Sequence, residues 1–362
     1  MWKRIKNWIE VRIGLDELIR KQLKEFRLPE NVNVFYTLGF VALVACIIQA
    51  LTGFLLIVYY VPHSEHAFRS VQDIMTKVPY GWLFRQMHVV GSNLIVAVFL
   101  LHLIAVLFMG SYKKPREMTW IGGVLMLIVV FLFCLSGFLL PWNQLGYWAT
   151  TIITTMPTAF PYLGDLVANV FRGGDYVSGS TLNRLFALHV AILPLVFVGL
   201  TGVHLFLIKR IGISSSPFSE SSEERGPWVK YRHEQYHGQP FYPHFFLKEI
   251  FMVMVYFVVM FFFITFLPTF FMPEYANIEA DPFITPPHIR PEWYFLAPYQ
   301  MLKLIPNKFF GISLQVIFMA VFLLWPFIDT WEKKNILKRP LLMSIILGVL
   351  TLWVILTAWG RY

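Results

Sequence analysis

Charge is scarce in this sequence. Only 14% of its 362 residues are Asp, Glu, Lys or Arg, whereas 57% are hydrophobic. Soluble domains carry about 25% charged residues, so this composition excludes a soluble globular protein and indicates a chain that crosses a membrane several times. Cysteine is scarcer still, because the only two, Cys46 and Cys134, lie within apolar stretches and have no metal-binding spacing. We interpret both as small apolar residues.

We expect no cleavable signal sequence, because charges interrupt every apolar run near the N-terminus. In residues 1–34 apolar side chains recur at helical spacing with basic residues between them. This pattern predicts an amphipathic helix that lies on a membrane surface. A solvated helix that packs on a partner subunit is the alternative interpretation.

The sequence contains several long apolar stretches. Seven of them reach or approach the roughly 20 residues that a helix needs to cross a bilayer. We therefore expect an all-α membrane protein with seven transmembrane helices. They are predicted at residues 35–61, 82–109, 119–140, 184–208, 246–270, 309–328 and 341–359.

The basic residues gather on one side of these predicted spans. If the N-terminus is cytoplasmic, 21 of the 30 lysines and arginines lie on the cytoplasmic side. Cytoplasmic loops of membrane proteins carry such an excess, so we expect this orientation. The net charge of +9 is then a topology signal and requires no nucleic-acid partner.

Four histidines lie inside the second and fourth predicted spans, namely His88 with His102 and His189 with His204. Ionisable side chains are costly within a membrane. Fourteen residues advance a helix by about 21 Å and return to within roughly 40° of the same face, while fifteen overshoot by roughly 60°. A single such histidine would suggest a hydrogen bond to a neighbouring helix. Two pairs at matched depths on parallel spans instead predict axial ligands for haem iron.

Glycines in the first and third predicted spans show the same period. Gly39 and Gly53 are fourteen residues apart, as are Gly123 and Gly137. Glycine permits close approach, here of a flat macrocycle to a helix backbone. Helix–helix packing explains each glycine alone, but the period shared by four helices predicts two stacked haems.

The whole chain resembles the cytochrome b/b6 family, the haem-bearing core of quinol-oxidising cytochrome bc complexes. Residues 35–212 resemble the four-helix cytochrome b6 and residues 245–362 the three-helix subunit IV, joined by a cytoplasmic connection at 213–244. Seven spans and the histidine spacing favour the b6-type branch. The motifs that carry the resemblance are VNVFYTLGF, LTGF, GWLFRQMH, YKKPREMTW, GFLLPWNQLGYWA and PEWYFLAPYQMLKLIPNK.

The resemblance implies two non-covalent b haems, one of low potential near the outer face and one of high potential near the cytoplasmic face. Their ligands would be His88 with His189 and His102 with His204, respectively.

The resemblance also implies roles for two arginines and bears on one threonine. Arg85 would pair with a propionate of the outer haem. Arg116 would do the same for the inner haem, or it is simply part of the basic cytoplasmic loop. The photosynthetic branch holds a further haem through a cysteine in the motif that matches VNVFYTLGF, and this chain has Thr37 there. We therefore predict no covalently attached haem.

In the family, an outer loop with the motif PEWY borders the quinol-oxidation site, and this chain has that motif at residues 291–294. Quinol oxidation requires a base, and burial can raise the pKa of a carboxylate toward the working pH. Without the resemblance, we would interpret Glu292, the acid of this loop, as a solvated side chain. The implied catalytic residues are Glu292 and Tyr294, the implied quinone-binding residues are Pro291, Glu292, Trp293 and Tyr294, and the opposite wall would be Gly146 and Tyr147.

The implied reaction is bifurcated quinol oxidation in a bacterial cytoplasmic membrane. One electron would pass to a Rieske iron–sulfur protein and a c-type cytochrome subunit, and the other would cross the membrane to quinone, with net proton translocation. Lys209 would lie near that second quinone, although a lysine that snorkels at a span end is an equal alternative. Glu25 is a candidate for proton delivery. The family also implies a homodimeric complex in contact with lipid and the quinone pool.

Two other functions compete with this interpretation. Residues 233–237, HEQYH, match the zinc-protease pattern, but Gly238 and Pro240 follow at once in a polar connection, whereas the chemistry needs both histidines on one helical face. A proton transporter could use the histidines as a relay. The spans show no inverted repeat and no line of acidic residues, which disfavours that alternative.

Overall fold

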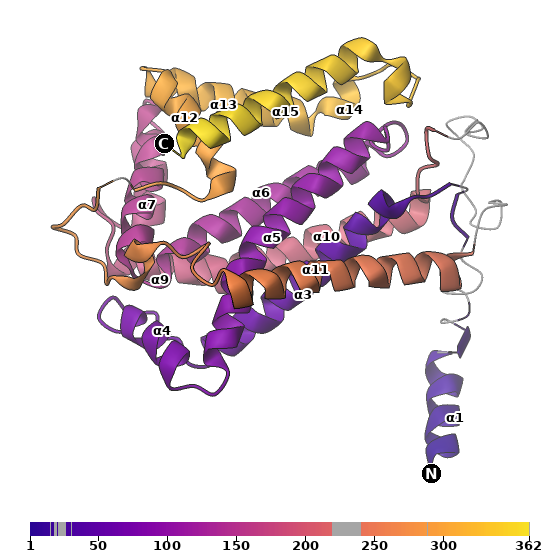
Figure 1. Cartoon of the computed structure of the whole chain (residues 1–362), viewed down its shortest axis with the longest axis horizontal. Helices are drawn as coiled ribbons and strands as arrows, with labels where there is room; N and C mark the ends of the chain where they lie inside the picture. Colours follow the sequence, from indigo (N-terminus) through magenta and orange to yellow (C-terminus); the bar gives the residue numbers. More distant parts are fainter. Residues whose placement is uncertain are drawn as a thin grey trace.

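The structure is a computed structural model. It describes residues 1–14, 16–17, 20, 27–29, 31–218, 240–287 and 289–361. Within these ranges the regular structure is helical, and β pairing is limited to two isolated bridges. The longest helices run side by side along the long axis of the molecule (Figure 1). The predicted all-α class is confirmed.

Four of these helical segments form a bundle. α3 (Leu38–Ile57) packs along α5 (Gly81–Phe108), and α6 (Glu117–Leu139) packs along α10 (Leu193–Ile211). α10 continues α9 (Gly179–Ala187) through the π-helical turn η4. The buried centre of the bundle is aliphatic and aromatic, with residues such as Val96, Phe99 and Val124. The stripes of apolar residues in the sequence thus become the contacts between neighbouring helices.

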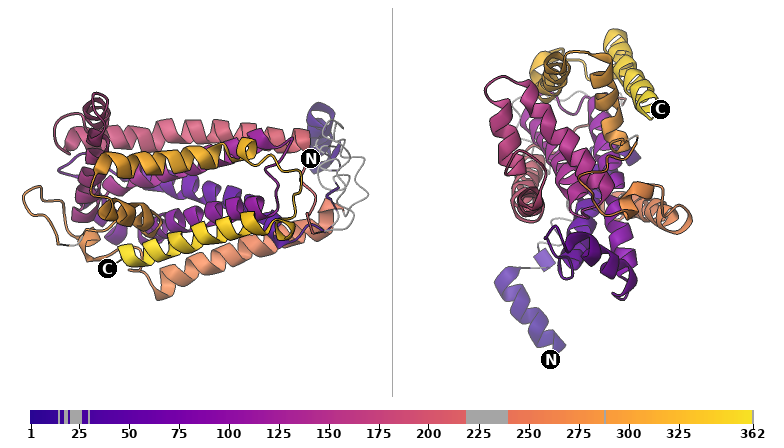
Figure 2. Two further views of the ribbon diagram at one scale, coloured as in Figure 1. Left: turned by 90° about the horizontal axis from the view of Figure 1, so that it is seen from above. Right: turned by 90° about the vertical axis from the view of Figure 1, so that its left-hand side faces the viewer.

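The C-terminal part packs against this bundle (Figure 2). α11 (Phe246–Phe266) lies along α5 and α3, while α12 and α15 pack on each other. Of the other helices of this part, α15 is as long as α11, whereas α12, α13 and α14 are shorter. Their bounds are α12 Trp293–Leu304, α13 Lys308–Leu323, α14 Trp325–Ile328 and α15 Pro340–Gly360.

Short helices close one end of the bundle. α4 (Ala67–Thr76) precedes α5, and α7 (Gln144–Thr155) follows α6 and crosses the direction of the long helices (Figure 1). α8 (Gly164–Arg172) leads on to α9. We call this end the α4 end.

Six helices of the described residues are long and apolar enough to cross a membrane. The seventh predicted span, at 309–328, is interrupted at Leu324, where the backbone leaves the helical region (φ −89°, ψ 8°) just before Pro326. α13 alone has 16 residues, fewer than the roughly 20 that a perpendicular span needs. Six of the predicted spans therefore coincide with such helices, and the seventh stays a prediction.

The N-terminal helix α1 (Trp2–Ile13) lies at the end of the bundle opposite to α4 and runs across the direction of the long helices (Figure 1). It contains no buried residue, and it ends at Gly14, whose φ of 63° is the left-handed conformation that glycine tolerates. This orientation suits a helix on a membrane surface, which stays a prediction.

Candidate functional site: two pairs of histidines inside the bundle

His88 on α5 and His189 in η4 form the first histidine pair. Their ring centroids are 6.3 Å apart and their planes meet at 69°. Two metal–imidazole bonds of about 2.0–2.1 Å, together with the inner halves of the two rings, span roughly 6 Å. The first pair is therefore spaced to hold one metal ion between its ring nitrogens.

A threonine hydroxyl orients the His88 ring. Thr52 Oγ1 donates its proton to the carbonyl of Ile48 at 2.7 Å and lies 3.0 Å from His88 Nδ1. Because the hydroxyl proton is already used, the Thr52 oxygen accepts from His88 Nδ1–H. The neutral ring then keeps the lone pair of Nε2 for a metal, as metal-ligating histidines generally do.

The same arrangement holds His189. Ser136 Oγ donates to the carbonyl of Leu132 at 2.8 Å and lies 3.0 Å from His189 Nδ1, and the carbonyl oxygen of Phe133 is 3.1 Å from that nitrogen. A carbonyl can only accept, so Nδ1 carries the proton. Both rings of the first pair thus have the tautomer that metal ligation through Nε2 requires.

His102 and His204 form the second pair, about four helical turns further along α5 and α10. The two rings are close enough to interact electrostatically. His102 Nδ1 is buried and has no hydrogen-bond partner in the described part of the chain, and the backbone of Thr119 adjoins the His204 ring. No hydroxyl of the described residues bonds to either ring, which distinguishes this pair from the first.

The four predicted glycines each face one of these rings. A β-carbon built on any of them would meet the ring at contact distance or closer, so an alanine would intrude on the place where a macrocycle meets the helix. Measured from the β-carbon position to ring Cε1, the pairs are Gly39 with His102 (3.2 Å), Gly53 with His88 (3.1 Å), Gly123 with His204 (3.6 Å) and Gly137 with His189 (2.7 Å).

A π-helical turn corrects the unequal histidine spacing. His189 lies within η4 (Leu188–Ile192), and a π turn contains one residue more than an α turn. The fifteen residues from His189 to His204 therefore cover about the same rotation and rise along the helix as the fourteen residues from His88 to His102. We expected helix rotation or curvature to absorb the overshoot, but the extra residue is taken up locally.

Both predicted arginines are buried at the rim of the bundle. Arg85 is 9% exposed, and its Nη1 donates to the sulfur of Met272 at 3.1 Å. Arg116 is 5% exposed and donates through Nε to the carbonyl of Gly212 at 3.2 Å. A thioether is a weak acceptor, so the Arg85 guanidinium keeps hydrogen-bonding capacity for an anionic group.

Thr52 and Ser136 are site residues that sequence reasoning missed. Each directly precedes a glycine that faces a histidine, within the matching segments LTGFLL at 51–56 and LSGFLL at 135–140. This internal repeat was the signal that could have identified both hydroxyls.

Glu292 begins α12 with extended backbone (φ −57°, ψ 155°), directly after Pro291. It is half-buried, and burial raises the pKa of its carboxyl to about 7. Tyr294, only 3% exposed, stacks on Phe131 of α6 with ring centroids 6.0 Å apart. Trp293 Nε1 donates to Asn93 Oδ1 of α5 at 3.1 Å. The start of α12 is thus fixed against the bundle and presents a carboxyl that titrates near neutral pH.

Gly146 and Tyr147 lie on α7. Gly146 has no room for a side chain, because a β-carbon would lie 2.2 Å from the carbonyl oxygen of Phe138. The Tyr147 hydroxyl donates to the carbonyl of Val177 at 3.2 Å, so this side chain is held in a cluster of its own. Leu145 of α7 belongs to another apolar cluster with Met272 and Ala276, and Ile289, just before Pro291, packs against that cluster.

At the other end of the bundle, Lys209 is exposed in the last turn of α10. This exposure is compatible with the alternative interpretation of Lys209 as a lysine that snorkels at the end of a span.

Glu249, near the start of α11, is 9% exposed. An acid buried in an apolar helix marks a functional site more often than not, and sequence reasoning overlooked this one. Glu25 and the HEQYH segment at 233–237 lie outside the described residues.

These features define a class of protein, an all-helical protein with membrane-spanning apolar helices and two pairs of histidines inside its bundle. The family model described as cytochrome b/b6/petB matches residues 23–212, and the model described as cytochrome b (C-terminal)/b6/petD matches residues 279–362. The chain belongs to the cytochrome b/b6 family.

Individual relatives agree with this assignment. The cytochrome b of Rickettsia conorii is 35% identical over 337 residues, which cover 93% of this chain and 81% of the relative. That of Rhodospirillum rubrum is 33% identical over 333 residues, or 92% and 79%. A chain of a hyperthermophilic respiratory Complex III has the same fold, with a TM-score of 0.89 and 35% identity over 98% of this chain and 91% of that one.

Proposed function

We propose that this chain is the cytochrome b subunit of a complex III-type enzyme that oxidises quinol and binds two b haems. The observation that carries the proposal is the 6.3 Å spacing of the His88 and His189 rings, together with a glycine against each of the four histidine rings. The family membership and the respiratory complex with the same fold support it.

Two haems, when bound, supply one-electron carriers at two depths of the membrane. The protein's task is to hold them. His88 and His189 would provide Nε2 ligands at one depth, because Thr52 and Ser136 hold the proton on the opposite ring nitrogen. His102 and His204 would serve the other depth, and Arg85 and Arg116 would pair with propionates.

Glu292 is the proposed proton acceptor for quinol at the outer face. Each quinol hydroxyl must lose its proton as electrons leave, and a base is most effective when its pKa lies near the working pH. Burial brings the pKa of Glu292 to about 7. The neighbouring Tyr294, buried against α6, offers a second polar atom for orienting the quinol.

Proton uptake at the cytoplasmic face is proposed to use Glu249. This acid is buried near the first turn of α11, and the neighbouring Lys248 donates to the carbonyl of Val32 at 3.5 Å. A buried acid at a membrane boundary can exchange protons with a quinone that water does not reach. Lys209 at the end of α10 is a second candidate for this site.

The wider assignment follows from the same family. We propose seven spans with a cytoplasmic N-terminus, a bacterial cytoplasmic membrane, Rieske and c-type cytochrome partners, a homodimeric complex and no covalent haem. The division of the chain into a haem-binding part at 35–212 and a quinol-loop part at 245–362 belongs to the proposal.

Purified complex supplied with quinol and a c-type cytochrome tests the proposal. We expect quinol to reduce both b haems and the acceptor, with protons released on the outer side of reconstituted vesicles. Failure of quinol to reduce any b haem in the intact complex would contradict the assignment.

A further inference from the structure

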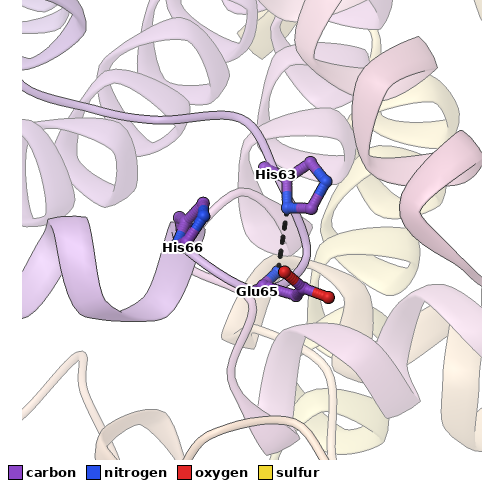
Figure 3. Close-up of side chains that lie close together, drawn as sticks. All are labelled: His63, Glu65 and His66. Atoms are coloured by element: carbon purple, nitrogen blue, oxygen red, sulfur yellow. Dashed lines mark hydrogen bonds between the residues drawn. The ribbon is translucent and has the colours of Figure 1, made fainter.

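Three metal-ligating side chains come together on the loop between α3 and α4, away from the haem set. They are His63, Glu65 and His66, and all three are exposed (Figure 3). One ligand atom from each lies within 4.8 Å of the others, and the two imidazole centroids are 5.4 Å apart. The mechanism proposed above uses none of them.

The backbone of this loop is fixed by its own hydrogen bonds. The amides of His66 and Ala67 both donate to the carbonyl of His63, at 2.9 and 2.7 Å. On the approach to the loop, the Tyr60 hydroxyl donates to the carbonyl of Leu140, at the end of α6, at 2.7 Å. An ion that binds here therefore has to order side chains only, which lowers the entropic cost of binding.

We propose that His63, Glu65 and His66 form a binding site for a divalent transition metal ion of the Zn²⁺ type. Two imidazoles and one carboxylate, with water in the fourth position, are a recurrent donor set for this ion. Ligand atoms around a tetrahedral zinc lie about 3.3 Å apart. Closing the present separations to that value requires only rotation of exposed side chains.

Local interactions are compatible with this ion. His63 Nδ1 accepts a hydrogen bond of 3.3 Å from the Glu65 amide, a long and exposed bond that a metal bond can replace at little cost. His66 caps α4, whose N-terminal end carries a partial positive charge. The Glu65 carboxylate offsets that charge and part of the charge of the ion.

The site is independent of the haem ligands but connected to their scaffold. α4 leads directly into α5, which carries His88. The loop also touches the start of α9, since a β-carbon on Gly179 would lie 3.3 Å from Ser64 Oγ. A bound ion would thus fasten the connection between α3 and α4 over this end of the bundle.

Titration of the intact complex with Zn²⁺ by calorimetry, after chelator treatment, tests the site. We expect the double substitution of His63→Ala with His66→Ala to remove one zinc equivalent per chain. Glu65→Gln should weaken the same equivalent about tenfold or more. His244→Ala is the matched control, because His244 is also exposed but lies at the far end of the bundle, and it should leave the titration unchanged.

Zinc-edge X-ray absorption of the complex with one equivalent bound should show two imidazole ligands. An unchanged haem spectrum in each variant verifies that the complex is intact. Equal zinc stoichiometry in the double variant and the unmodified complex would overturn the proposal, as would an absorption spectrum with fewer than two imidazoles.

Discussion

Replacing Thr52 by valine should raise the midpoint potential of the haem held by the first histidine pair. Valine keeps the branched shape of threonine but cannot accept the hydrogen bond from His88 Nδ1, which spans 3.0 Å. That bond makes the imidazole a stronger donor and so favours the oxidised iron. A hydrogen bond of this kind contributes about 0.5–1.5 kcal/mol, which corresponds to roughly 20–60 mV for one electron.

A potentiometric redox titration, followed at the absorption bands of the two haems, measures this shift. The potential of the second haem should not move, because its ligands have no hydroxyl partner among the described residues. Thr201→Val is the matched control, since the Thr201 hydroxyl lies 3.5 Å from the sulfur of Met126 and bonds to no histidine. A lowered or unchanged potential in Thr52→Val, or a shift of the second haem instead, would refute the reasoning.

Three further predictions follow from the site and its surroundings. Gly137→Ala places a β-carbon 2.7 Å from His189 Cε1, so one haem should be lost while the other remains, measured as haem per protein. Glu292→Gln should slow quinol oxidation by about 10²-fold or more. It should also abolish the rise in rate as the pH increases through about 7, the pKa of the Glu292 carboxyl. Asp329 pairs with the buried Lys113 and Arg339. Asp329→Asn leaves these two cations without their carboxylate and should lower the free energy of unfolding by about 3–5 kcal/mol, measured by thermal denaturation in detergent.

Each of these predictions has a control on the chain. Gly199→Ala adds a β-carbon with nothing within 4 Å and should keep both haems. Glu279→Gln removes an exposed carboxylate of the segment that precedes α12 and should leave the pH profile intact. Asp73→Asn breaks only an exposed pair with Lys77 and should cost less than about 0.5 kcal/mol. A test variant that behaves like its control would contradict the corresponding argument.

Asp329 also predicts a dependence of stability on pH. Burial alone would raise the pKa of its carboxyl, but hydrogen bonds from Arg339, Tyr112 and Lys113 outweigh burial and hold the pKa well below its usual range. A depressed folded-state pKa contributes stability above the unfolded value of about 3.9. That contribution is lost as the pH falls from there through the folded value, and Asp329→Asn should remove this part of the acid sensitivity.

The sequence predicted the long helices because apolar length is a strong and local signal. It did not predict the break at Leu324, although Pro326 was a visible reason for one, since proline removes a backbone donor and disfavours the helical conformation of the residue before it. The histidines and glycines could be matched by spacing, and the structure places each glycine against a ring.

Other features depend on information that spacing does not carry. The π turn around His189 replaces a rotation that helical geometry alone suggested, because a fifteen-residue interval does not say where its extra residue is inserted. Lys113 and Asp329 are 216 residues apart in the chain and meet only after the helices have packed. Thr52 and Ser136 are different, since the repeated segments that contain them were visible in the sequence.

The proposed function depends above all on two histidine pairs that hold two haems at different depths. Reduced-minus-oxidised spectra of the complex, combined with haem quantification, test it most directly when His102→Ala and His88→Ala are compared with the unmodified chain. We expect two b haems in the unmodified complex, and loss of a different one in each variant with the other largely retained. A single haem in the unmodified complex, or loss of the same haem in both variants, would contradict it.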